Sequence, residues 1–137
     1  MRILGIDYGD RRTGIAMSDE TEFLASAIAT IKGQDMDYVA SEVQKICSQN
    51  NVYKIVLGLP KNMDGSSGFR VAHTLDFKSK LLELMPDAEI IMFDERMTTM
   101  AAAQYMNITD VRGKKRKDTI DSLAAKIILQ DYLDSKK

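Results

Sequence analysis

Cysteine and histidine, which close disulfides and bind soft metal ions, are almost missing from this sequence. The 137 residues include one of each, Cys47 and His73. One cysteine cannot form an intramolecular disulfide, and this pair cannot supply a multi-cysteine zinc site. The composition therefore argues against a disulfide-stapled secreted scaffold and fits a reducing compartment, so we expect a cytoplasmic protein.

Long apolar runs and an excess of one charge are also missing. The first strand reaches Asp7 before any apolar region of signal-peptide length, and no run approaches a membrane span. We therefore expect no membrane partner. Nineteen basic against twenty acidic residues give a net charge of −1, so nucleic-acid binding would need a local basic patch. The length and the 45% hydrophobic content favour one domain over residues 1–137.

Turn residues and hydrophobic periodicity predict the order βββ-α-β-α-β-α-α. Strands are expected at 2–8, 13–18, 23–31, 52–57 and 88–93. The first helix is expected to begin after Asp35, its N-cap, and the second to span 69–85. A short third helix is expected from Thr98 or Thr99 to about 106, and the last helix is expected to begin near Asp118, which is a likelier cap than Asp121. The polar segment 107–117 is expected to be a mobile loop. This α/β order favours a mixed sheet, antiparallel first and parallel later, flanked by helices.

Carboxylates stand where such a fold could bring them together. Asp7 ends the first strand, Glu95 follows the last one, and Asp118 and Asp121 share a helix face. Each also has a plainer interpretation. Asp7 could be a turn aspartate, Glu95 a surface partner of Arg96, and the two helical aspartates simply favourable acids in a first helical turn. Phosphodiester hydrolysis by two cations about 3.5–4 Å apart needs acidic oxygen ligands. The set thus favours Mg²⁺ or Mn²⁺ over zinc.

Glycine-rich and basic segments could handle phosphate. Residues 7–14 and 58–68 allow close backbone approach, although neither carries the Gly-Lys-Ser/Thr ending of a P-loop. His73 is interpreted as a surface or capping residue rather than a catalytic one. A basic run before Asp118 is either a solvated face or a backbone contact, and we favour contact. The candidate nucleic-acid-binding residues are Arg11, Arg12, Lys61, Arg70, Arg96, Arg112, Lys114, Lys115, Arg116 and Lys117.

Several motifs in a fixed order resemble the YqgF family, also called RuvX, over nearly the whole chain. They are Gly5-Ile6-Asp7-Tyr8-Gly9, residues 56–60 with 62–66, Phe69 to Phe77, residues 94–99, 120–125 and 128–134. Family members are described as pre-16S rRNA nucleases or Holliday-junction resolvases. The resemblance implies a ribonuclease H-like sheet of order 3-2-1-4-5. It also implies catalytic and metal-binding roles for Asp7, Glu95 and Asp121, with Asp7 bridging two cations. Asp118 resembles an extra acidic position of RuvC-type resolvases and is a second-rank ligand.

We expect a metal-dependent endonuclease that processes the 5′ end of pre-16S rRNA, with the small-subunit precursor as its partner. A Holliday-junction resolvase, acting on structured DNA, is the first alternative. The segment from Asp7 to Gly14 also resembles the phosphate loop of the actin, hexokinase and Hsp70 superfamily, which makes an ATP-dependent phosphotransferase or ATPase the second alternative. Against it, 137 residues supply one lobe where those proteins use two. A non-catalytic RNA-binding assembly factor is the third alternative. Either a monomer or a homodimer fits the sequence.

Overall fold

The computed structural model describes residues 2–9, 11–59, 68–94 and 113–135. Its strands are β1 (Ile3–Asp7), β2 (Arg12–Ser18), β3 (Ala25–Lys32), β4 (Lys54–Leu59) and β5 (Glu89–Asp94). Its helices are α1 (Met36–Asn50), α2 (Gly68–Leu84) and α4 (Gly113–Ser135). The strands form one sheet of order β3-β2-β1-β4-β5, antiparallel across β3, β2 and β1 and parallel across β1, β4 and β5. The predicted mixed sheet of order 3-2-1-4-5 is confirmed.

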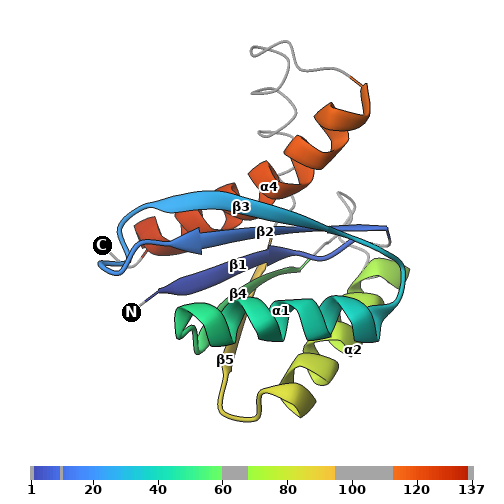
Figure 1. Cartoon of the computed structure of the whole chain (residues 1–137), viewed down its shortest axis with the longest axis horizontal. Helices are drawn as coiled ribbons and strands as arrows, with labels where there is room; N and C mark the ends of the chain where they lie inside the picture. Colours follow the sequence, from blue (N-terminus) through green and yellow to red (C-terminus); the bar gives the residue numbers. More distant parts are fainter. Residues whose placement is uncertain (1, 10, 60–67, 95–112, 136–137) are drawn as a thin grey trace.

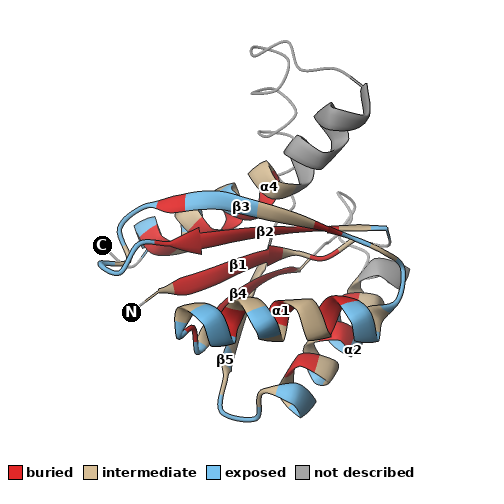
Figure 2. Ribbon diagram, viewed as in Figure 1, coloured by how far each residue is buried: buried red, intermediate tan, exposed pale blue. Residues whose placement is uncertain are grey.

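Helices cover both faces of the sheet, α1 and α2 on one and α4 on the other (Figure 1). The alternation of side chains along β1 explains the division, because successive residues of a strand point to opposite faces. Leu4, Ile6 and Tyr8 belong to the core that also contains residues of α1 and α2, whereas Ile3 belongs to the core built with α4. The central strands are accordingly buried, while much of β3 is exposed (Figure 2).

An aromatic stack fixes α2 against the chain just beyond β1. The rings of Tyr8 and Phe77 are nearly parallel, with an interplanar angle of 12° and centroids 4.2 Å apart. Phe77 is fully buried. Offset or stacked aromatic pairs add about 0.5–1.5 kcal/mol to the burial of their surface. Tyr8 directly follows Asp7, so this contact also holds the backbone beside the candidate catalytic residue.

Helix α1 begins and ends with local signals that the sequence carries. The Asp35 side chain accepts a hydrogen bond from the Asp37 N–H at 3.0 Å, which confirms the predicted N-cap. Asn51 closes the helix in the left-handed conformation with φ of 55° and donates its N–H to the Cys47 carbonyl. An ion pair of 2.7 Å between Lys80 and Asp37 then joins α2 to α1.

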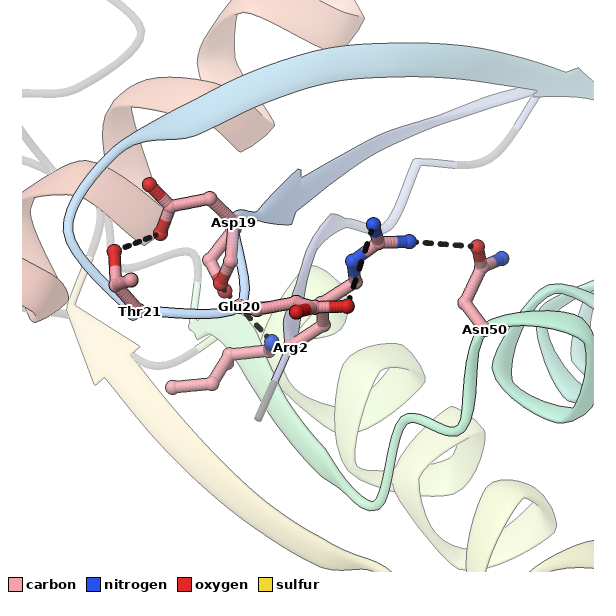
Figure 3. Close-up of polar contacts among 7 residues, drawn as sticks. Arg2, Asp19, Glu20, Thr21 and Asn50 are labelled. Atoms are coloured by element: carbon pink, nitrogen blue, oxygen red, sulfur yellow. Dashed lines mark hydrogen bonds and ion pairs between the residues drawn. The ribbon is translucent and has the colours of Figure 1, made fainter.

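Polar contacts close the edge of the sheet where the parallel strands begin (Figure 3). The Ser18 hydroxyl accepts from the Ile3 N–H at 2.8 Å and donates to the Asp19 carbonyl at 2.9 Å. Arg2 donates to the Asn50 side chain at 3.3 Å and lies 4.0 Å from a Glu20 oxygen. These contacts tie β1, the β2–β3 turn and the end of α1 together at the edge opposite Asp7.

Helix α4 corrects two predictions. It begins at Gly113 rather than near Asp118, so residues 114–117 are helical and not part of a loop. Asp118 consequently lies inside the helix and is not its N-cap. Lysine and arginine are strong helix formers, but their dense clustering is also typical of a solvated loop, and this suggested a loop here. The helix expected at about 98–106 and the rest of the expected loop, 107–112, lie outside the described residues.

Strand β4 is shifted from the expected 52–57 to Lys54–Leu59, because Val52 still bonds to the end of α1. No helix in the described part of the chain is long and apolar enough to cross a membrane.

Candidate active site

Asp7 is the last residue of β1 and lies on the sheet face that α4 covers. Ile3 packs on α4, and a Cβ placed on Gly5 would lie 2.7 Å from the Leu129 Cβ. Asp7 follows these positions by two-residue steps, so it shares their face. It is half-buried and takes part in polar interactions. The carboxyl ends of the parallel strands β1, β4 and β5 meet at this edge, where α/β sheets commonly bind ligands.

A row of positions across the sheet places glycine on each side of Asp7. Gly14 is its partner on β2, and Thr30 is the partner of Gly14 on β3. Continuing the parallel register of β1 and β4 by one residue puts Gly58 on the other side of Asp7, with Phe93 beyond it on β5. We call these five positions the Asp7 row. Both glycines are buried, and neither neighbouring strand carries a side chain beside the carboxylate.

Small residues in the preceding row bring α4 close to the sheet. Gly5 is aligned with Val56 on one side and with Ala16 and then Ala27 on the other. Besides Leu129, the backbone oxygen of Ala125 would lie 3.1 Å from a Cβ on Gly5. Only glycine permits this approach without a shift of the helix. The position of α4 over the Asp7 row therefore depends on Gly5.

The direction of α4 brings position 121 toward Asp7. The carboxyl-terminal half of α4 lies near the start of β1, since Leu133 shares a core with Ile3, and Figure 1 shows the helix running back along the strand. Asp121 precedes Ala125 by one turn, about 6 Å along the helix. Asp7 follows Gly5 by about 6.6–6.8 Å along the strand. Both steps lead to the same edge, on the same face.

The remaining predicted acidic residues are only partly visible. Glu95 follows β5 directly and lies outside the described residues, as do the side chains of Asp118 and Asp121. Within the described ranges, no three His, Cys, Asp or Glu side chains gather as a metal-binding group. The proposed set of Asp7, Glu95 and Asp121 therefore stays a prediction.

The predicted nucleic-acid-binding residues fall into three groups. Arg11 is exposed just before β2, and Arg12 is the half-buried first residue of that strand. Arg70 lies in the first turn of α2 and Lys114, Lys115, Arg116 and Lys117 in the first turns of α4, with side chains outside the description. Lys61, Arg96 and Arg112 lie outside the described residues altogether.

The single histidine and the single cysteine of the sequence lie away from the Asp7 row. Half-buried His73 belongs to α2, on the opposite side of the sheet. Cys47 is buried in α1, and burial raises the pKa of its thiol to about 11. A thiol with that pKa is protonated at neutral pH and is a poor nucleophile.

Cavities also mark the opposite edge of the sheet. One of 380 Å³ lies among the ends of α1 and α2 and the start of β5, lined in part by Cys47, Leu84 and Met85. Another of 510 Å³ is lined by residues that include Arg2, Asn50 and Tyr53. Neither includes a residue of the Asp7 row. The candidate site thus lies at the carboxyl edge of the sheet and not in either of these pockets.

The sequence alone does not reveal that two glycines flank Asp7 or that a second cation, Lys32, is aligned with Arg12. Gly14 and Gly58 belong to the glycine-rich segments 7–14 and 58–68, but their alignment with Asp7 depends on strand register. Lys32 carries no motif of its own. It is the register partner of Arg12, and only the pairing of β2 with β3 reveals this.

Known proteins resemble this chain in sequence and in fold. A family model described as "RuvX: Holliday junction resolvase" matches residues 1–135. A Staphylococcus haemolyticus protein named "Putative pre-16S rRNA nuclease" is 45% identical over 136 residues, covering 98% of this chain and 96% of its own. A Staphylococcus aureus protein of the same name is 44% identical with the same coverage.

Solved structures share the ribonuclease H-like fold. RuvC of Thermus thermophilus in complex with a Holliday junction superposes with a TM-score of 0.60 at 12% identity, covering 99% of this chain and 96% of its own. The fowlpox virus Holliday junction resolvase gives 0.61 at 15% identity, with both chains fully covered. The family match and the two staphylococcal relatives together establish that this chain belongs to the RuvX family.

Proposed function

We propose that this protein is a metal-dependent endonuclease that hydrolyses phosphodiester bonds and processes the 5′ region of pre-16S rRNA. The observation that carries the proposal is the setting of Asp7: a carboxylate between two glycines at the carboxyl edge of the sheet, on the face that α4 covers. Membership of the RuvX family and the names of the staphylococcal relatives support the reaction and the substrate.

The donor set fits a hard divalent cation. Asp7 offers carboxylate oxygens at a half-buried position, and the residue aligned with it on each neighbouring strand is a glycine. In the proposal, Glu95 and Asp121 complete the site, and Asp118, one turn before Asp121, is a second-rank ligand. Oxygen ligands favour Mg²⁺ or Mn²⁺. When bound, such ions activate water and stabilise the charge that develops on the phosphate.

The chain itself holds and orients the reacting groups. The Gly5 contact sets the height of α4 above the Asp7 row, and the Tyr8–Phe77 stack holds the backbone that follows Asp7. Gly14 and Gly58 place no side chain beside the Asp7 carboxylate. In the proposal, the helical basic residues 114–117, one to two turns before Asp121, neutralise the nucleic-acid backbone.

Resolution of Holliday junctions is the second candidate, favoured by the description of the family model. Two symmetric cuts in a junction are most simply made by a two-fold dimer. The net charge of −1 suits a short RNA strand better than four duplex arms. For this reason we place the rRNA precursor first.

A direct competition between substrates tests the proposal. Equal amounts of a 5′ pre-16S rRNA fragment and a mobile four-way junction are incubated with the protein, the same salt and Mn²⁺, and the cuts are mapped. We expect cleavage of the RNA that EDTA abolishes. Paired symmetric nicks in the junction, with the RNA intact, would replace this substrate by the second candidate. Cleavage of neither would reject the nuclease proposal.

A further inference from the structure

Two basic residues face each other across β2 and β3, two residues along the strands from the Asp7 row. Arg12 and Lys32 are aligned as register partners at the ends of their strands. Thr13 and Ile31, which come between them and the Asp7 row, are buried; Ile31 packs in the core shared with α1 and α2. By alternation, Arg12 and Lys32 therefore belong to the other face, the one that carries Asp7.

The strand ends hold this pair in place. Just beyond Lys32, the Gly33 N–H donates to the Arg11 carbonyl at 2.9 Å and extends the ladder between β2 and β3. Lys32 is exposed and Arg12 is half-buried. Both cations thus rise from a paired backbone rather than from a loose loop, while solvent still reaches them.

The pair lies within reach of a substrate bound at Asp7. Strands are about 4.8 Å apart, and two residues advance about 6.8 Å along a strand. The Cα atoms of Arg12 and Lys32 therefore lie about 8 Å and about 12 Å from that of Asp7. Both lie on the β3 side, away from β4 and β5. A nucleic-acid strand crossing the carboxyl edge would meet them on one side of the bond to be cut.

A phosphate that binds between these two side chains gains a two-pronged contact from arginine and a point charge from lysine. Resting on the proposed function, we propose that Arg12 and Lys32 form a phosphate-binding subsite that holds the substrate backbone on the β3 side of the scissile bond. The subsite adds Lys32 to the residues that contact substrate and places this contact on one side of the scissile bond.

Binding measurements on a variant that cannot cut test the subsite. In the Asp7→Asn background, Lys32→Gln is compared with Lys45→Gln, which removes an exposed lysine of α1 on the other side of the sheet. Affinity for a single-stranded RNA is measured at several salt concentrations. We expect Lys32→Gln to reduce the log–log salt slope by about 0.7, the value for one phosphate contact on a single strand, in every RNA sequence tested. Lys45→Gln should leave the slope unchanged.

Neutral linkages locate the contact. RNAs carrying one methylphosphonate at successive positions are bound by Asp7→Asn protein with and without Lys32→Gln. We expect one linkage, on one side of the cleavage position, to weaken binding only while Lys32 is present. If Lys32→Gln matches Lys45→Gln although the parent protein binds RNA, the subsite is refuted and the proposed function stands. If wild-type protein neither binds nor cuts nucleic acid, the proposed function fails and the subsite with it.

Discussion

The closest packing of α4 on the sheet can be tested by adding a single methyl group. In Gly5→Ala, the new Cβ would lie 2.7 Å from the Leu129 Cβ and 3.1 Å from the Ala125 carbonyl oxygen. Neither atom is the far end of a flexible side chain, so relief requires a shift of the helix backbone. Overpacking of this kind costs about 1–3 kcal/mol.

The opposing term is smaller. Replacing glycine by alanine lowers the conformational entropy of the unfolded chain and so stabilises the folded protein by about 0.4–1 kcal/mol. The net loss of unfolding free energy should therefore be about 0–2.6 kcal/mol, with a midpoint of about 1.3 kcal/mol, and each kcal/mol lowers Tm by about 3–4 °C in a chain of this size. Activity should fall further, because a displacement of about 1 Å between catalytic groups can cost about a hundredfold in rate.

Urea unfolding and cleavage rate are measured for Gly5→Ala and for a matched control, Ala27→Val. Ala27 is aligned in the same row but exposed on β3, so added methyl groups there should change stability by less than about 0.5 kcal/mol. A Gly5→Ala protein as stable and as active as wild type would show that the contact between α4 and β1 does not position the site.

Other contacts make independent predictions. Phe77→Ala should cost about 3–5 kcal/mol in urea unfolding, because it removes a fully buried ring stacked on Tyr8; a loss below 1 kcal/mol would contradict that packing. Hydrogen bonds, chiefly from the Phe23 N–H, lower the pKa of Asp19. Its charged form therefore stabilises the fold above about pH 4, and this contribution is lost as the pH falls further. The difference in stability between wild type and Asp19→Asn should be constant above about pH 5 and shrink as the pH falls below about 4; a difference that stays constant there would refute the assignment. Gln130 accepts a hydrogen bond from the Ala25 N–H and donates one to the Phe23 carbonyl, next to the edge strand β3. Because unpaired backbone groups at a sheet edge can pair with another chain, Gln130→Ala should increase self-association in sedimentation velocity. An unchanged sedimentation profile would show that Gln130 does not protect this edge.

Much of the fold could be predicted because its signals are local. The alternation along β1, the Asp35 cap and the three- to four-residue apolar spacing of α1 each act within a few residues, and all three appear in the structure. The start of α4 could not be predicted in the same way. Residues 114–117 combine high helix propensity with dense charge, and composition favoured a loop.

For the candidate site, the sequence predicts a set of residues but not how they are arranged. Asp7 was identifiable from its place at a strand end. Its glycine neighbours and the partnership of Arg12 with Lys32 arise from register between strands, and register depends on contacts between residues far apart in sequence. The motifs of the RuvX family supplied Glu95 and Asp121, for which the chain offers only general carboxylate chemistry.

The effect of Asp7→Asn on cleavage tests the central proposal most directly. The substitution keeps the size of the side chain but removes the charge that a divalent cation needs, so Mg²⁺- or Mn²⁺-dependent cleavage should be lost while urea unfolding shows an intact fold. Asp87→Asn, an exposed carboxylate beside the cavity at the opposite edge, should cut like wild type. Cleavage at the wild-type rate by a folded Asp7→Asn protein would contradict the proposed active site.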